Sequence, residues 1–123
     1  NEMKDVFVSQ KMEFDSISSV EIDNLIKTKD AVKINSFYNR VKSNNILVSA
    51  MGRPEFIDKN FLSSNMILLD IGISKKDGKV LGDIKQEDTK ELEGYFTPVP
   101  GGIGPMTVAC LLKNVVLSFL NKK

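Results

Sequence analysis

The stretch MILLDIGI, residues 66–73, is the most apolar run of the chain and predicts a strand. The stretch NILVSA, residues 45–50, is also apolar on both faces, which is typical of a strand buried in a parallel sheet. Both runs end in small or turn-forming residues, and the segment MGRPEFI separates them. Two such strands, joined by a connection that crosses back, indicate the centre of a parallel sheet.

The flanking segments complete an alternating pattern of strands and helices. SSVEIDNLIKTKD, residues 18–30, predicts a helix that begins with a capping box formed by Ser18 and Glu21. SKKDGKVLGDI predicts a hairpin that turns at Asp77 and Gly78. Further elements are expected as strands at residues 6–8 and 31–34, a short helix near residues 57–62, and a final helix over about residues 105–120. The pattern predicts one α/β domain over residues 1–123, with a mostly parallel sheet flanked by helices and one short antiparallel hairpin.

Composition excludes several functions. The chain of 123 residues carries 17 basic and 16 acidic residues, and this near-neutral balance gives no sign of nucleic-acid binding. Histidine is absent, and Cys110 is the single cysteine, so the chain offers neither a histidine base nor a histidine or thiolate metal site. We expect Cys110 to be an inert core thiol. We expect that no apolar run reaches the length of a membrane span, and no metal or membrane partner is predicted.

Ligands of open parallel sheets bind beyond the carboxyl ends of the strands. Gly52 and Gly72 follow the two apolar strands, and a loop rich in proline and glycine, residues 97–104, precedes the last helix. Each glycine alone could serve a tight turn, but together they favour a binding edge. Asp70 ends its strand and could be either a cap or a catalytic group. The lysines of the hairpin are interpreted as solvated, with phosphate binding as the weaker alternative.

The final helix is apolar around most of its circumference. A helix of this kind must be covered on more than one side, and one sheet covers only one side. It could lie within the core of this domain, but we favour packing against another domain or a second copy. Pro105 is expected at its first helical position, which suits the fixed φ angle of proline.

Three ordered blocks closely resemble the bifunctional methylenetetrahydrofolate dehydrogenase/methenyltetrahydrofolate cyclohydrolases. The blocks are ILVSAMGRPEFI, ILLDIGISKKDGKVLGDI and TPVPGGIGPMTVACLLKN, and together they cover about residues 45–114. The resemblance is to the C-terminal, Rossmann-like domain of that family, which binds NAD(P). It therefore implies a role in folate one-carbon metabolism.

The same resemblance implies site residues. The folate substrate would contact the loop at Pro100, Gly101, Gly102, Ile103 and Gly104. The cofactor, NADP or NAD, would contact Ser9, Gln10, Lys11, Ser36, Ala50, Gly52, Ile73 and Thr107. The family's catalytic lysine belongs to a Tyr-x-x-x-Lys motif in an N-terminal folate domain, and no such motif occurs here. Since the chain begins with Asn1 rather than Met, we expect that domain to be missing, no catalytic residue in this chain, and little or no turnover by the chain alone.

The chain departs from the family at its first turn. The family has a glycine-containing turn at the cofactor phosphates, whereas VFVSQKMEFDS here has no glycine, and none occurs before Gly52. Two hypotheses follow. The domain binds NADP through an altered turn, or it has lost the dinucleotide and serves as the lid of a cyclohydrolase or as a dimerisation domain. A generic interaction module is the least favoured. A homodimer is possible on either hypothesis, and the sequence does not distinguish a cytoplasmic from a mitochondrial protein.

Overall fold

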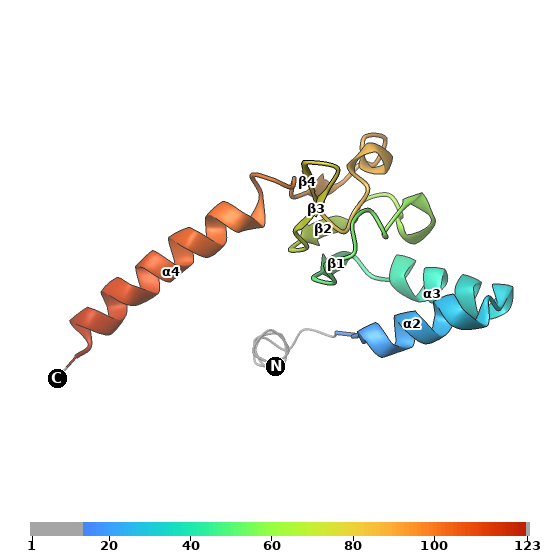
Figure 1. Cartoon of the computed structure of the whole chain (residues 1–123), viewed down its shortest axis with the longest axis horizontal. Coiled ribbons are helices and arrows are strands. Elements are labelled where there is room, and N and C mark those ends of the chain that lie inside the picture. Colours follow the sequence, from blue (N-terminus) through green and yellow to red (C-terminus); the bar gives the residue numbers. More distant parts are fainter. Residues whose placement is uncertain (1–13, 123) are drawn as a thin grey trace. The chain divides into compact units, whose positions relative to one another are not determined.

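The computed structural model describes residues 14–122, and the chain divides into two compact units at the boundary between Ile34 and Asn35. The predicted strand at residues 6–8 lies outside the described residues, as do Ser9, Gln10 and Lys11. Two helices begin the described chain: α2 (Ser19–Thr28) and α3 (Ala31–Lys42), which runs through the boundary. Figure 1 shows the elements in chain order.

Helix α2 confirms the predicted capping box. The Glu21 amide donates to Ser18 Oγ at 3.2 Å, and the Ser18 amide donates to Glu21 Oε2 at 2.8 Å. Two amide groups of the first turn, which no helical carbonyl can reach, thereby find acceptors. The helix ends at Lys29, whose φ angle of 49° is left-handed.

The strand predicted at residues 31–34 is wrong, because these residues form the first turn of α3. Asp30 caps that turn, since its carboxylate accepts from the amides of Val32 and Lys33. Ile34 and Val41 are seven residues apart, which is two helical turns, so the short apolar run at residues 31–34 is part of a helical pattern.

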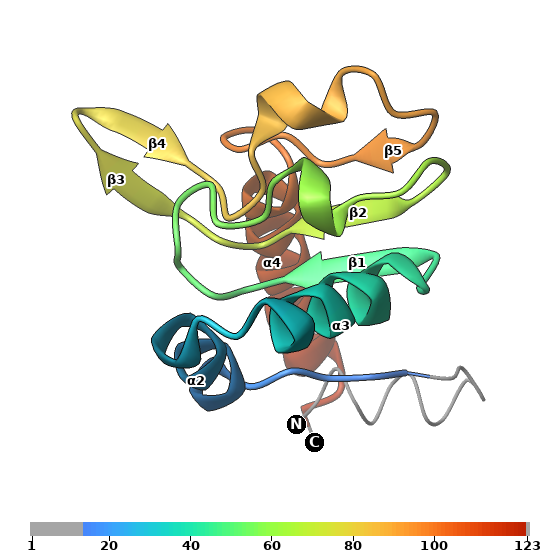
Figure 2. The ribbon, with the colours of Figure 1, turned by 90° about the vertical axis from the view of Figure 1, so that its right-hand side faces the viewer.

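Three strands form the parallel sheet, in the order β1-β2-β5. They are β1 (Ile46–Ser49), β2 (Ile67–Asp70) and β5 (Tyr95–Phe96). Ser49 of β1 pairs with Asp70 of β2, and Leu68 of β2 pairs with Phe96 of β5. Figure 2 shows the three strands side by side with their arrowheads at the same edge. The two apolar strands and their parallel pairing confirm the α/β prediction, whereas the two-residue strand β5 was too short to be seen in the sequence pattern.

The predicted hairpin is confirmed. It consists of β3 (Ser74–Lys76) and β4 (Lys79–Leu81), which pair antiparallel and leave the carboxyl end of β2 (Figure 2). Asp77 and Gly78 at the turn have φ angles of 51° and 77°, the positive values that a two-residue hairpin turn requires.

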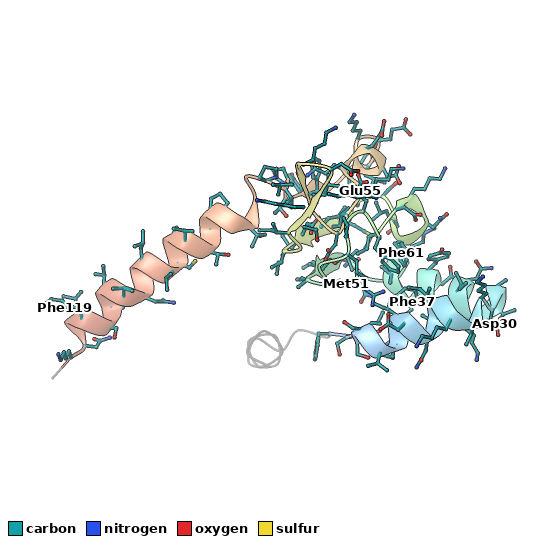
Figure 3. All side chains as sticks on the ribbon, viewed as in Figure 1. Asp30, Phe37, Met51, Glu55, Phe61 and Phe119 are labelled. Atoms are coloured by element: carbon teal, nitrogen blue, oxygen red, sulfur yellow. The ribbon has the colours of Figure 1, made fainter. Side chains whose placement is uncertain are left out.

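Short 3₁₀ helices connect the strands. The predicted helix near residues 57–62 is the 3₁₀ turn η1 (Lys59–Phe61), and η2 (Gln86–Thr89) lies between the hairpin and β5. The core gathers around β2 and η1, and its buried apolar side chains include Ile57, Phe61, Leu62, Met66, Leu68 and Ile84. The ring of Phe61 contacts the rings of Phe37 and Tyr38 edge-on, with centroids 5.5 and 4.7 Å apart. Phe37 and Phe61 are labelled in Figure 3. This aromatic cluster ties the second half of α3 to the core.

Helix α4 (Ile103–Leu120) ends the described chain, and none of its residues is buried. Its side chains stand out on both sides of the helix (Figure 3). The helix begins two residues earlier than predicted, so Pro105 occupies the third helical position rather than the first. Cys110 is exposed, so the prediction of a core thiol is wrong for the described structure.

Length and composition alone would allow α4 to cross a membrane, because its 18 residues have a mean hydropathy of 1.7. The expectation that no apolar run reaches that length is therefore wrong. The sequence of α4 nevertheless argues against a span, since Lys113 and Asn114 lie in its middle third, where a charge is most costly in lipid.

Candidate functional site

Three chain segments leave the sheet at the carboxyl edge of its parallel strands. Residues 50–53 follow β1, residues 71–73 follow β2, and residues 97–102 follow β5. Ala50 and Gly52 are exposed, and Ile73 is 61% exposed. Most of the residues that the sequence singled out thus lie along one edge of the sheet.

Asp83 holds the segment after β1. This side chain is fully buried, at 0% exposure, in the chain that follows β4. Its Oδ2 accepts from Ser49 Oγ at 2.8 Å and from the Met51 amide at 2.6 Å, and its Oδ1 accepts from the Arg53 amide at 2.8 Å. One carboxylate therefore fixes both the end of β1 and the turn beyond it.

Asp70 holds the segment after β2 in the same way. It is 2% exposed, and its Oδ1 accepts from the amides of Gly72 and Asp83 at 3.0 and 3.1 Å. Its Oδ2 accepts from the Ile84 amide at 2.9 Å. Of the two roles considered for Asp70, these bonds are those of a cap, and they connect β2 to the same loop that carries Asp83.

The two carboxylates need two glycines. A Cβ atom on Gly72 would overlap the carboxylate of Asp83, and a Cβ atom on Gly82 would overlap the carboxylate of Asp70. The loops can approach this closely because glycine has no side chain. We call these four residues, Asp70, Gly72, Gly82 and Asp83, the carboxylate clamp.

Burial raises the pKa of Asp70 above its ordinary value of 3.8, because the ionised form loses solvation. The amides of Ile84, Asp83 and Gly72 oppose this shift by stabilising the charged carboxylate, while the neighbouring charge of Asp83 adds to it. Desolvation is the largest of these effects, so ionising Asp70 costs more free energy in the folded chain than in the unfolded chain.

The loop rich in proline and glycine is anchored to the same edge. The Asp70 amide donates to Thr97 Oγ1 at 2.9 Å, and Gln86 Nε2 donates to the Val99 carbonyl at 3.0 Å. The bond between Val99 and Pro100 is cis. Pro100 and Gly101 are exposed, and the following residues, Gly102, Ile103 and Gly104, are half-buried. The loop thus presents backbone to solvent beside the strand ends.

The structure assembles part of the predicted site. Ala50, Gly52 and Ile73 lie at the strand-end edge with residues 100–104, and Thr107 lies one turn into α4, where its hydroxyl donates to the Ile103 carbonyl at 3.0 Å. Ser36 is an exposed residue within α3 and does not follow a strand, so the strand predicted before it is wrong, while its contact with the cofactor stays a prediction.

Three residues of the edge were missed by sequence reasoning: Asp83, Gln86 and Thr97. The Gly-Asp pair directly after the hairpin was the available signal for Asp83, since an acid beside a glycine in an apolar stretch often marks a capped turn. Over residues 14–122 no group of three or more acidic or cysteine side chains is placed to hold a metal ion.

A parallel α/β sheet whose strands end in such open turns defines a domain that binds ligands, nucleotides among them, along its carboxyl edge. Comparison with known proteins gives the family. Residues 20–123 match the family model described as tetrahydrofolate dehydrogenase/cyclohydrolase, NAD(P)-binding domain, and the chain belongs to this family. Its cofactor class is therefore a nicotinamide dinucleotide.

Curated proteins with similar sequences belong to the same family. The bifunctional protein FolD of Natranaerobius thermophilus is 39% identical over 90 residues, which are 73% of this chain and 30% of that protein. FolD of Aquifex aeolicus is 41% identical over 97 residues, 79% of this chain and 31% of that protein. The chain thus spans about a third of the length of these curated relatives.

Solved structures show the same fold. The bifunctional 5,10-methylenetetrahydrofolate dehydrogenase/cyclohydrolase of Thermoplasma acidophilum superposes with a TM-score of 0.60 at 40% identity, over 64% of this chain and 29% of that one. A 5,10-methylenetetrahydrofolate dehydrogenase from the silkworm, Bombyx mori, superposes with a TM-score of 0.62 at 30% identity, over 72% of this chain and 31% of that one.

The backbone at Gly52 leaves room for a ligand. A Cβ atom on Gly52 would meet no atom within 4 Å, so the backbone there is open to an approaching ligand, and its φ angle of 67° favours glycine. Family membership favours the dinucleotide-binding hypothesis over a dinucleotide-free lid.

Proposed function

We propose that this chain is the NADP-binding part of a methylenetetrahydrofolate dehydrogenase that also hydrolyses the methenyl product. The observation that carries the proposal is the convergence of three open segments, after β1, β2 and β5, on one edge of a sheet in a domain of this family. The names of the matched FolD and dehydrogenase/cyclohydrolase proteins support the reaction.

In this proposal each group of residues contacts a different part of the dinucleotide. Backbone groups of Ala50, Gly52 and Ile73 line the groove for the dinucleotide along the strand ends, and Thr107 borders it from the first turns of α4. Ser9, Gln10 and Lys11 take the place of the family's glycine turn at the phosphates. When bound, the dinucleotide accepts a hydride from the folate substrate.

The loop at residues 100–104 forms one wall of the folate site. Its prolines fix the backbone, and its glycines let a flat pterin ring approach without side-chain interference. The group that acts on the folate lies outside this chain, in the N-terminal part that the relatives possess and the present sequence lacks. The chain alone should therefore bind cofactor but not turn over substrate.

Calorimetric titration tests the proposal. We expect the chain to bind NADP with a dissociation constant in the micromolar range, more tightly than NAD, and to show no dehydrogenase activity without the N-terminal part. Silence with both nucleotides would refute the proposal and favour a dinucleotide-free lid of a cyclohydrolase. Robust dehydrogenase activity of the chain alone would refute the division of labour between the two parts.

We also propose that the apolar surface of α4 is covered in the full-length protein by residues N-terminal to this chain. Its exposed side chains include Leu111, Leu112, Val115 and Phe119, at 58–76% exposure. A second copy is the competing occupant. Sedimentation of the full-length protein and of this chain separates them, because a homodimer through α4 predicts a dimer in both, whereas coverage within one chain predicts self-association of the isolated domain only.

A further inference from the structure

The carboxylate clamp does more than stabilise the fold, because it sets the direction of backbone groups at the edge. The amides of Met51 and Arg53 both donate to the buried carboxylate of Asp83, so both point into the protein. Residues Ala50 and Gly52, which precede them, are exposed. Two alternate peptide groups of this turn are thus oriented by one side chain.

A trans peptide group holds its C=O opposite to its N–H. Within the described residues the bond between Val99 and Pro100 is the one cis bond, so the groups joining residues 50 to 51 and 52 to 53 are trans. With the amides of Met51 and Arg53 aimed at Asp83, the carbonyl oxygens of Ala50 and Gly52 are directed away from it. The positive φ of Gly52 lets the chain curl around one carboxylate.

We infer that Asp83 is a positioning residue for the dinucleotide, because it aims the carbonyls of Ala50 and Gly52 outward as hydrogen-bond acceptors for the nucleoside part of the cofactor. The inference rests on the proposed function, in which these two residues line the groove. Carbonyl oxygens attract amide and hydroxyl donors and repel phosphate, so this part of the edge selects a nicotinamide, adenine or ribose group rather than the pyrophosphate.

Ser49 and Gly72 also hold the carboxylate of Asp83 in place, and each can be changed without changing Asp83 itself. Ser49 donates a third bond to Asp83 from the last position of β1, and Gly72 leaves the space that the carboxylate fills. Replacing Gly72 by alanine should displace the carboxylate without changing its chemistry, while replacing Ser49 by alanine should leave both amide bonds in place.

The test is NADP affinity of the 123-residue chain by calorimetry. In Asp83→Asn, the amide nitrogen of the new side chain faces the Arg53 amide, so two donors meet and the turn must move. We expect the dissociation constant to rise at least tenfold, with Gly72→Ala changing in the same direction and Ser49→Ala changing less than threefold. Leu62→Val, a core substitution away from the edge, should lower the melting temperature and leave affinity within twofold.

Two results would overturn the inference: a folded Asp83→Asn variant that binds NADP as the parent does, or an affinity loss in Leu62→Val equal to that in Asp83→Asn. Amide hydrogen exchange of the unmodified chain tests the geometry even where a variant fails to fold. The amides of Met51 and Arg53 should exchange much more slowly than that of Gly52, and equal exchange at the three positions would contradict the positioning role. A parent chain that binds neither NADP nor NAD would refute the proposed function, while the exchange pattern would still decide the role of Asp83.

Discussion

The carboxylate clamp and helix α4 lie in the same family domain and differ in almost every physical respect. The clamp buries two acids and saturates them with hydrogen bonds from three separate segments. The helix is long and apolar, yet none of its 18 residues is buried. In these two regions acidic side chains are buried and apolar side chains are exposed, the reverse of the usual distribution.

The difference shows which of the two regions finds its contacts within the described residues. The two carboxylates of the clamp accept every hydrogen bond that the structure shows for them from residues 49–84, so their geometry is set within this chain. An apolar helix gains stability mainly from burial, and α4 finds no cover here. This contrast fits a chain that spans about a third of its relatives, and it can be tested by making the same substitution in both regions.

The largest effect is expected from deleting a leucine side chain in each region. Leu68 in β2 is 2% exposed and Leu112 in α4 is 63% exposed. Leu68→Ala should destabilise the chain by about 2–5 kcal/mol because it leaves a cavity. Leu112→Ala should change the stability by less than about 0.5 kcal/mol because little burial is lost. Urea unfolding at a chain concentration low enough to keep the chain monomeric measures both, and equal losses there would show that α4 is covered within the chain and that the contrast is false.

A glycine substitution should even change sign between the regions. Gly82→Ala places a Cβ atom against the Asp70 carboxylate and should cost about 1–3 kcal/mol through overpacking. Gly104→Ala adds a Cβ atom where none of the described atoms lies within 4 Å, in the first turn of α4, and should stabilise the chain by up to about 1 kcal/mol through helix propensity. Thermal unfolding of the two variants gives the signs, and a stabilised Gly82→Ala would disprove the close packing of the clamp.

The sequence predicted the parts of the fold that depend on local pattern. The two long apolar strands, the hairpin at Asp77 and Gly78, and the capping box of α2 were all found, because each is set by residues close together in the chain. Strand β5 was missed because two residues carry no period, and residues 31–34 were misassigned because so short a run, with three apolar residues in four, suits a strand or a helix equally.

The site was predictable only in part. The glycines after the two apolar strands indicated a candidate binding edge, because parallel strands bring their carboxyl ends together at one edge of the sheet. Asp83 escaped notice because its partners, Ser49, Met51 and Arg53, lie 30 or more residues away, and no local pattern reports contacts at that separation. Ser36 lies in a helix rather than after a strand, so its predicted contact with the cofactor rests on the family resemblance alone.

Asp70 in the clamp should make the stability of the chain depend on pH. Helix α4 carries no acidic residue, so it contributes no carboxylate titration of this kind. The pKa of Asp70 is raised above 3.8, so the folded chain holds this proton at a pH where the unfolded chain has released it. The contribution is complete below pH 3.8 and is lost as the pH rises through the folded-state pKa, with a slope of at most about 1.4 kcal/mol per pH unit.

Asp70→Asn removes this titration, so the stability that it costs should be greatest at low pH and should decrease toward neutrality. Urea unfolding of both proteins between pH 4 and 7 measures the difference. Asp77→Asn, at the exposed hairpin turn, is the control for losing a carboxylate outside the clamp. A cost that grows toward neutral pH would reverse the sign and show that the amide bonds to Asp70 outweigh its desolvation.

The smallest contrast concerns two threonines. Thr97 Oγ1 accepts from the Asp70 amide at 2.9 Å, and Thr107 Oγ1 donates to a carbonyl of its own helix at 3.0 Å. Thr97→Val should cost about 1 kcal/mol, because valine keeps the shape but leaves the amide of the buried Asp70 without its acceptor, and Thr97→Ser should restore most of the lost stability. Thr107→Val should cost less than about 0.5 kcal/mol, since its hydroxyl is exposed and its loss leaves a carbonyl already bonded in the helix. If Thr97→Val leaves the stability unchanged while Thr107→Val lowers it, the hydrogen bond at the edge of the sheet does not stabilise the chain and the contacts of α4 do. The contrast between the two regions would then be wrong.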